Sequence, residues 1–296
     1  MPIPTKTTTA TTKSEAAGEP LAIVAAGGTV PFEVATAAHQ AGRRVLVLAL
    51  EGDVDPRLSQ FPLERVKWGQ VGRLESLIAD AGARQLVFIG SVDKRPDFSS
   101  IGVDFGTLKL MPFILRSMIG GDDSVLGNVV SFFEQRGIRV VGAHEVAPSL
   151  VAAPGQVAGP RISGAMMAEV RVAMEAARAI GALDIGQAAI AVGSRVVALE
   201  AAEGTDAMIE RVAGLKQSGR LKWSGRAGVL AKRSKPQQDL RVDMPAVGPR
   251  TVTAVAAAGL AGIVIEAGRV LIADRAATVA EADRTGTFIF AVGEGT

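Results

Sequence analysis

A polar loop in the last third of the chain holds most of the side chains that could do chemistry. The loop, GVLAKRSKPQQDLRVDMPAVGP, runs from Gly228 to Pro249 between two apolar segments. Asp239 and Asp243 are four residues apart, so their carboxylates share one side of an extended segment or of a helical turn. Such carboxylates, with glutamine oxygens nearby, suit Mg²⁺, which keeps several waters and shares substrate phosphates. The pattern therefore predicts chemistry on a phosphorylated ligand.

Cations in the same loop could neutralise the charge of a phosphate in a transition state. The predicted catalytic residues are Asp239, Asp243, Lys232 and Arg241. The two aspartates are also the predicted metal ligands, and Lys235 and Gln238 are predicted substrate contacts. The alternative is a solvated loop whose aspartates cap turns and whose charges pair. Long loops of one chemical character are more often functional, which favours the catalytic interpretation.

Two glycine-containing turns stand where a strand should lead into a helix, whose first amides can hold a phosphate. The turn in the second half contains Gly204, Thr205 and Asp206; the alternative is that Thr205 or Asp206 only caps the helix. The turn near the start, AAGGTVP, offers Gly27, Gly28 and Thr29. Its alternative is a tight strand-to-helix connection, and because it is not G-x-G-x-x-G it does not support a dinucleotide cofactor.

A third cluster, GSVDKRPDF, follows an apolar strand of the first half and contains Lys94, Arg95 and Asp97. Ligands of open α/β sheets bind beyond the carboxyl ends of strands, so we predict substrate contacts here; a surface turn on Pro96 is the alternative. The pair Asp122-Asp123 is predicted to cap a helix rather than to bind a metal.

Composition excludes several classes of catalyst. The chain of 296 residues has no cysteine and only two histidines, His39 and His144, both predicted to be structural. Thiol nucleophiles, zinc–thiolate sites and multi-histidine metal sites are therefore excluded, and no Walker P-loop or G-x-S-x-G motif occurs. The 32 basic and 30 acidic side chains nearly balance, which gives no reason to expect nucleic-acid binding. With neither a signal peptide nor an apolar span, we expect a cytoplasmic protein.

Strands and helices alternate over the first half, which predicts an α/β fold. After a disordered Thr-rich tail at 1–20, residues 21–143 are predicted to form a Rossmann-like domain with a parallel sheet. Residues 144–160, with three prolines, are predicted to be a linker or hinge. Residues 161–296 are predicted to form an α+β domain with a mixed sheet, including hairpins at Gly193-Ser194 and at Ala267-Gly268.

The polar clusters, in this order, resemble the LpxI family of UDP-2,3-diacylglucosamine pyrophosphatases. The resemblance rests on AAGGTVP, the KRPDF turn, QAAIAV…ALEAAEGTDAMIER, KxxKPxQDxRxDxPxxG and AAGLAGIVIEAGRVL, and it extends from Leu21 to Val292. The sequence departs from the family in its Thr-rich extension and in the alanines that open the glycine turn. Gln187, which opens QAAIAV, joins the predicted substrate contacts on this resemblance.

The resemblance implies a hydrolase of lipid A biosynthesis in a Gram-negative bacterium. It would use Mg²⁺, or alternatively Mn²⁺, to direct water to the α-phosphorus, releasing UMP and 2,3-diacylglucosamine 1-phosphate. An essential aspartate of the family motif matches Asp239 or Asp243, between which spacing does not decide. A lipid-linked substrate also implies peripheral contact with the inner membrane, and a homodimer is expected from base rates.

Two other classes of function fit the sequence less well. A non-catalytic sensor of sugar nucleotides or lipids could close around its ligand by the same hinge, but it has less need of a dense carboxylate–lysine loop. An NAD-dependent enzyme or a nucleotide-sugar transferase would be expected to carry the missing glycine fingerprint. Release of UMP from UDP-2,3-diacylglucosamine would separate the hydrolase from the sensor.

Overall fold

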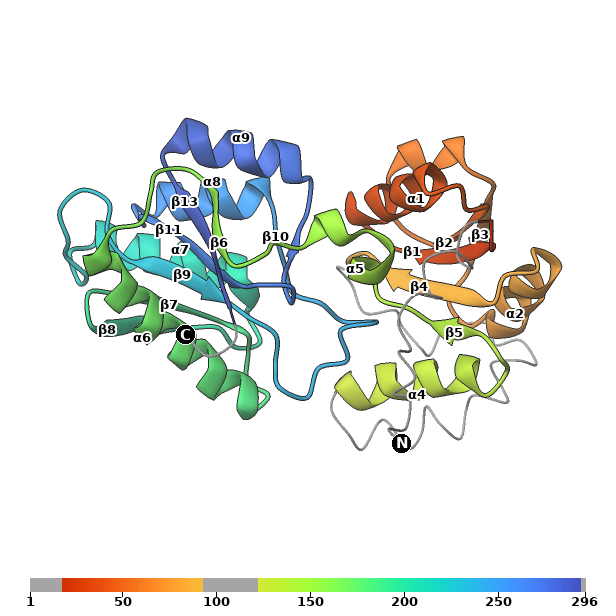
Figure 1. Cartoon of the computed structure of the whole chain (residues 1–296). Coiled ribbons are helices and arrows are strands. Elements are labelled where there is room, and N and C mark those ends of the chain that lie inside the picture. Colours follow the sequence, from red (N-terminus) through yellow and green to blue (C-terminus); the bar gives the residue numbers. More distant parts are fainter. Residues whose placement is uncertain (1–17, 93–121, 294–296) are drawn as a thin grey trace, which may run out of the picture. The chain divides into compact units, whose positions relative to one another are not determined.

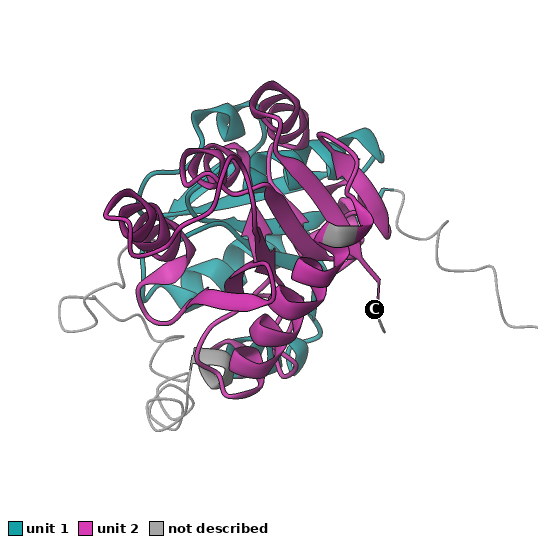
Figure 2. Cartoon of the chain, turned by 90° about the vertical axis from the view of Figure 1, so that its left-hand side faces the viewer, with its two compact units in different colours: residues 1–119, 128–141 teal, residues 120–127, 142–296 magenta. Residues whose placement is uncertain are grey.

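The structure, a computed structural model, describes residues 18–92 and 122–293. The chain divides into two compact units, residues 1–119 with 128–141 and residues 120–127 with 142–296 (Figure 2). A five-stranded sheet forms the first unit, and a six-stranded sheet with a separate two-stranded sheet forms the second (Figure 1).

The sheet of the first unit is wholly parallel, in the strand order β3-β2-β1-β4-β5. Its strands are β1 (Leu21–Ala25), β2 (Val45–Leu50), β3 (Leu63–Val66), β4 (Gln85–Ile89) and β5 (Arg139–Val140). The helical segments around it are α1 (Val30–Gln40), η1 (Pro56–Gln60), α2 (Val71–Asp80) and α4 (Asp122–Glu134). This order is that of a doubly wound sheet, with its switch point between β1 and β4. The prediction of a Rossmann-like parallel sheet is confirmed.

Apolar runs form the central strands because both faces of a parallel sheet are covered. Every residue of β1 is buried, and β2 is buried at four of its six positions. Pro31 lies in the first turn of α1, where its fixed φ suits a helix start, and Gly42 follows the helix with a φ of +80°. The turn Ala26–Thr29, which connects β1 to α1, lies at the carboxyl end of β1.

The six-stranded sheet of the second unit is mixed, in the order β6-β13-β11-β9-β7-β8. Its strands are β6 (Gly155–Ala158), β7 (Ala188–Val192), β8 (Arg195–Leu199), β9 (Val229–Lys232), β11 (Gly262–Glu266) and β13 (Phe288–Val292). The pairs β9–β11 and β11–β13 are parallel, whereas β6 and β7 run antiparallel to their neighbours. As a result β8, β9, β11 and β13 all end at one edge of the sheet, which we call the carboxyl edge.

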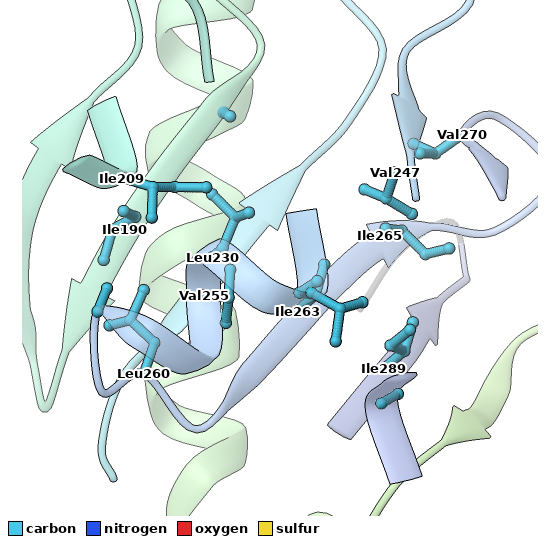
Figure 3. Close-up of a cluster of buried hydrophobic side chains, with 14 of the residues drawn as sticks. Ile190, Ile209, Leu230, Val247, Val255, Leu260, Ile263, Ile265, Val270 and Ile289 are labelled. Carbon is cyan, nitrogen blue, oxygen red and sulfur yellow. The ribbon is translucent and has the colours of Figure 1, made fainter. Parts of the chain in front are cut away.

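Helices cover both faces of this sheet. They are α6 (Gly164–Ala182) on one face and α7 (Gly204–Gln217), α8 (Pro249–Ala257) and α9 (Arg275–Thr285) on the other (Figure 1). Alternate strand residues such as Ile190, Leu230 and Ile263 pack under α7 and α8 (Figure 3). Their neighbours Ala189, Ala191, Val229 and Ala231 pack against α6. This alternation fixes the face to which each residue at the carboxyl edge points.

Removing side-chain volume from the larger of these cores is expected to destabilise the second unit. Ile263 is completely buried in β11, so Ile263→Ala should cost about 2–5 kcal/mol of unfolding free energy. The control Leu183→Ala, at a residue 72% exposed, should change it by less than about 0.5 kcal/mol. Trp223 packs against this core, so its fluorescence in a Trp68→Phe background reports the transition in urea. Equal costs for the two variants would contradict the assigned core.

One predicted hairpin is confirmed and the other is wrong. β7 and β8 are antiparallel and joined at Gly193, whose φ is +62°. By contrast, β11 is parallel to both of its neighbours, β9 and β13, so neither of its edges is open to the segment that follows Gly268. That segment instead forms β12 (Leu271–Ile272), which pairs in parallel with β10 (Ala246–Val247).

The segment 144–160 contains regular structure. The elements there are α5 (Ala143–Val146), η2 (Pro148–Leu150) and β6. Because β6 pairs with β13, the end of this segment belongs to the six-stranded sheet. Among the helices of the described residues, none is both long enough and apolar enough to cross a membrane.

Candidate functional site

Lys232 is the last residue of β9 and brings a charge to the carboxyl edge of the six-stranded sheet. It pairs with Ala188 of β7 and Ile265 of β11, and it lies on the same face as Leu230, the face that α7 covers. Only 9% of Lys232 is exposed. Burial lowers the pKa of Lys232, and the carboxylates of Glu200, Asp206 and Asp243 oppose that change. The ammonium is thus held inside the protein by negative charge on several sides.

A chain of hydrogen bonds connects Lys232 to the start of α7. Lys232 Nζ donates to Thr205 Oγ1 at 3.0 Å, and the Thr205 hydroxyl donates to Glu200 Oε1 at 2.7 Å. The other oxygen of Glu200 accepts from the backbone N–H of Gln187 at 3.0 Å. Lys232 belongs to β9 and Thr205 to α7. Gln187 directly precedes β7, and Glu200 directly follows β8. The structure therefore brings together Lys232, Thr205 and Gln187, three predicted site residues.

One of the roles predicted for the turn Gly204-Thr205-Asp206, that of a helix cap, is not found. The N-cap position of α7 is Glu203, with no side-chain capping bond, so the prediction that Thr205 or Asp206 caps the helix is wrong. Gly204 has a φ of +81°, which favours glycine and lets the chain turn sharply into the helix. Thr205 then lies inside the first turn, where its buried hydroxyl reaches both Lys232 and Glu200.

Gln238 connects two parts of the polar loop, at Lys235 and at Asp243. Its side-chain Oε1 accepts from the backbone N–H of Lys235 at 3.0 Å, and its Nε2 donates to Asp243 Oδ2 at 2.6 Å. Only 6% of Gln238 is exposed. A buried amide that is hydrogen-bonded on both sides fixes the conformation of the loop. Gln238 thus positions Asp243, and little of it is accessible to a ligand.

Asp239 and Asp243 occupy one helical turn but have different surroundings. The N–H of Asp243 donates to the carbonyl of Asp239 at 3.0 Å, which closes the turn. Arg241 holds both oxygens of Asp239, with Nε at 2.9 Å from Oδ1 and Nη2 at 2.7 Å from Oδ2. These hydrogen bonds lower the pKa of Asp239 below its usual range. Asp243 Oδ1, by contrast, accepts no hydrogen bond from any part of the chain that the structure describes.

The donor chemistry of this turn fits Mg²⁺. No three or more His, Cys, Asp or Glu side chains within residues 18–92 and 122–293 are grouped so that they could hold a metal ion. Mg²⁺ does not require such a cage, because one or two carboxylates suffice when substrate phosphates and waters complete its octahedron. The oxygen Oδ1 of Asp243 meets that need, with Asp239 as a second carboxylate that Arg241 already binds.

A second buried carboxylate, Glu266, anchors the beginning of the loop. Glu266 is the last residue of β11 and is 6% exposed. Its Oε2 accepts from the N–H and the hydroxyl of Ser234 at 3.1 and 2.8 Å, and its Oε1 accepts from Arg233 at 2.8 Å. Two further contacts hold the loop to the end of α6: Lys235 Nζ to Asp184 at 2.6 Å and Gln237 Nε2 to the Gly181 carbonyl at 3.3 Å.

Gln187 has a polar atom without a partner. Its backbone is satisfied on both sides, because the N–H donates to Glu200 and the carbonyl accepts from Arg233 at 3.0 Å. Its side-chain Oε1 is buried and accepts no hydrogen bond from the described residues. A buried, unsatisfied amide oxygen is rare in folded proteins, which keeps Gln187 as a candidate for contact with a ligand.

The predicted contacts of the first unit lie at the switch point of its own sheet. The N–H of Gly27 donates to the Ser91 carbonyl at 2.9 Å and is therefore engaged. A Cβ at Gly27 would also meet the backbone oxygens of Ser91 and Asp53 at 3.1 and 3.2 Å, so glycine allows this close approach. Gly28 has a φ of +90°, and the Thr29 hydroxyl donates to Glu33 at 3.3 Å. This geometry is that of a tight connection between β1 and α1.

The remaining predictions for the first unit lie outside the described residues or concern side chains that are not described. Lys94, Arg95 and Asp97 fall in the undescribed segment 93–121. Helix α4 begins at Asp122, so Asp122 and Asp123 are its first two residues and not the residue before it; their side chains are not described, and their capping role stays a prediction. His39 packs edge-on against Phe61 at 5.8 Å between ring centroids, a structural contact.

Sequence reasoning missed Glu200, Glu266 and Ser234. Both glutamates close an apolar strand segment, RVVALE and GIVIE, in which every other residue except Arg195 is apolar or glycine. A single acid at the end of such a run is a signal that could have identified them, since buried carboxylates need dedicated partners. Ser234 gives no such signal in the sequence.

Fold and site together define the class of protein. Polar and charged residues gather at the carboxyl edge of strands in an α/β protein, where enzymes of this class bind anionic ligands. Two family models cover nearly all of the described chain: the LpxI N-terminal domain over residues 20–150 and the LpxI C-terminal domain over residues 153–290. The chain belongs to the LpxI family.

A curated relative from Caulobacter vibrioides supports this membership. It is the UDP-2,3-diacylglucosamine pyrophosphatase LpxI of that organism, and it is 41% identical over 272 residues. The aligned region covers 92% of this chain and 97% of the relative. The resemblance inferred from the sequence motifs is confirmed.

Proposed function

We propose that this chain hydrolyses the pyrophosphate bond of UDP-2,3-diacylglucosamine to UMP and 2,3-diacylglucosamine 1-phosphate. The observation that carries the proposal is the 41% identity with a UDP-2,3-diacylglucosamine pyrophosphatase over 92% of this chain. The geometry of the second unit supports it, because a buried ammonium and a carboxylate lie at a sheet edge that can accept phosphates. Phosphoryl transfer of this kind needs positioning and charge neutralisation but no covalent nucleophile.

In the proposed reaction a water oxygen forms a bond to the α-phosphorus, and the water releases one proton to the solvent. The bond from that phosphorus to the bridging oxygen breaks, and 2,3-diacylglucosamine 1-phosphate leaves with the electron pair. Lys232 donates one N–H hydrogen bond to Thr205 and directs its other two N–H groups at the phosphate oxygens, where negative charge grows. Gln238 holds Asp243 so that its Oδ1 faces the reacting groups.

Magnesium is part of this proposal. Asp243 would hold the ion, and Asp239, one helical turn away, keeps both oxygens on Arg241; Mn²⁺ is the alternative metal. When bound, the ion supplies neutralisation of the phosphate oxygens and lowers the pKa of a coordinated water. Lys235 and Arg241, which lie on the same loop, add positive charge around the phosphates. Contact with the inner membrane and a homodimer stay predictions.

The proposal predicts metal-dependent release of UMP by the purified full-length chain. UDP-2,3-diacylglucosamine in detergent micelles with Mg²⁺ should yield UMP, and excess EDTA should lower the rate by at least about 100-fold, with recovery on adding Mg²⁺. In water labelled with ¹⁸O, the label should enter UMP, since attack is on the α-phosphorus. Label in the lipid phosphate would contradict the assigned phosphorus. Binding of the substrate without UMP release would replace the hydrolase with the sensor.

A further inference from the structure

Glu200 is a buried carboxylate to which the proposed reaction assigns no role. It follows β8 directly, and only 5% of it is exposed. Both of its oxygens accept hydrogen bonds, Oε1 from the Thr205 hydroxyl at 2.7 Å and Oε2 from the Gln187 N–H at 3.0 Å. A carboxylate held at both oxygens has a fixed position and orientation, and burial makes replacing either contact by water difficult.

The backbone around Glu200 is fixed as well. The N–H of Glu200 donates to the Ala188 carbonyl at 2.9 Å, which continues the β7–β8 pairing. Gly186 lies against the Glu200 backbone so closely that a Cβ at position 186 would collide with the Glu200 carbonyl. A glycine is therefore needed for the hairpin end to reach Glu200. The carboxylate is consequently anchored to the sheet and does not depend on the polar loop.

Donor and acceptor chemistry then fixes the direction of each proton in the chain. An ammonium can only donate, so Thr205 Oγ1 must accept from Lys232 Nζ. The single hydroxyl proton of Thr205 is then left for Glu200 Oε1. Glu200 thus determines that Thr205 presents a lone pair to Lys232. Without an acceptor at Glu200, the hydroxyl proton could turn toward the ammonium and repel it.

We propose that Glu200 is a positioning residue which, through Thr205, aims the Lys232 ammonium at the phosphates of the substrate. The inference rests on the proposed function and deepens it, because it names what orients the proposed catalytic cation. Electrostatics agree with the geometry. Burial lowers the pKa of Lys232, and Glu200 opposes that change ahead of Asp206 and Asp243. Glu200 therefore orients the Lys232 ammonium through Thr205 and also stabilises its positive charge.

The substitution Glu200→Gln tests this arrangement with almost no change in size. Gln187 N–H and the Thr205 hydroxyl both need an acceptor, and glutamine offers one oxygen where glutamate offers two. If the NH₂ group faces the Gln187 N–H, two donors oppose each other. If it faces Thr205, the hydroxyl must accept from it and turn its own proton away from position 200. We expect kcat to fall about 10- to 100-fold, as for other partners that orient a reacting group, with KM changed less than about threefold.

A double-mutant cycle separates positioning from a merely structural role. If Glu200 acts through Lys232, Glu200→Gln should have less than about a twofold effect on kcat in a Lys232→Met background. A structural role would lower kcat by the same factor in both backgrounds, and that result would overturn the proposal. Thermal melts of all four proteins establish that each variant is folded when it is assayed.

Two substitutions of Thr205 test the same arrangement at its middle residue. Thr205→Val removes the hydroxyl and should match Glu200→Gln, whereas Thr205→Ser keeps it and should stay within about threefold of wild type. Thr278→Val is the matched control, because Thr278 is a buried threonine like Thr205 and its hydroxyl donates to the Ala273 carbonyl at 2.6 Å. The control should keep wild-type kcat. Wild-type kcat in Thr205→Val would overturn the proposal.

A crystal structure of Glu200→Gln gives a readout that does not depend on turnover. We expect Lys232 Nζ to move away from Thr205 Oγ1, and an unchanged contact near 3.0 Å would overturn the inference. Failure of wild-type protein to release UMP would instead refute the proposed function, so the two failures are distinguishable. In that case the crystal structure still decides whether Glu200 positions Lys232.

Discussion

Asp243→Asn is expected to lower kcat on the order of 1,000-fold while substrate affinity changes less than about threefold. Asparagine keeps the size of the side chain but removes its negative charge, and its amide no longer offers two acceptor oxygens. Asp243 Oδ1 accepts no hydrogen bond from the described residues, so it is the carboxylate oxygen available to a metal or a water. Single-turnover UMP release gives the rate, and equilibrium binding of substrate gives the affinity.

Asp239→Asn is the matched control for this prediction, because it makes the same change four residues earlier. Asp239 is partly exposed and already engaged by Arg241, and such pairs contribute little. We therefore expect kcat to fall less than about tenfold. A larger loss in Asp239→Asn than in Asp243→Asn would reverse the roles assigned to the two aspartates.

Lys232→Met is expected to lower kcat by about 100- to 1,000-fold, the usual cost of removing one group that stabilises developing charge. Methionine fills much of the same space without the ammonium, so the sheet around position 232 should stay packed. Stopped assays for UMP measure the loss, and circular dichroism establishes that the variant keeps its fold.

Lys232→Arg tests whether the site requires an ammonium or only a positive charge. A guanidinium is larger and planar, so it does not fit a site built around one buried ammonium, and we expect activity to stay low. Lys216→Met is the control: Lys216 lies in the last turn of α7, far along that helix from Thr205, and over the Trp223 ring at 4.6 Å. It should retain wild-type kcat. Full rescue by arginine would show that Lys232 supplies only charge.

Local patterns were sufficient for most of the fold. The apolar runs of β1 and β2 predicted buried parallel strands, and Gly193-Ser194 predicted the β7–β8 hairpin. The hairpin expected at Ala267-Gly268 failed because strand pairing is a competition across the whole sheet. The turn is locally suitable, but β9 and β13 occupy both edges of β11. The short strand β6, GQVA, has too weak a pattern to be recognised without its partner β13.

The candidate site was predictable in outline but not in its contacts. The spacing of Asp239 and Asp243 left a helical turn and an extended segment open, and the structure has the turn. Which of the two aspartates binds Arg241 depends on the direction of the Arg241 side chain, and spacing does not determine that direction. The partners of Glu200 were unpredictable for a related reason, although its place at the end of an apolar run marks the residue itself. Its importance comes from Gln187 and Thr205, which the hairpin and α7 bring to it.

The pairing of β6 with β13 has a consequence for synthesis of the protein. β6 is the first strand of the six-stranded sheet to leave the ribosome, and its partner β13 is the last. Until β13 is made, β6 has no neighbour and the outer edge of β11 is open, an arrangement prone to pairing with other chains. Closing so long a loop is also entropically costly and slow. The second unit must therefore complete its sheet after β13 has been synthesised, and a chain cut before β13 would leave two strand edges exposed.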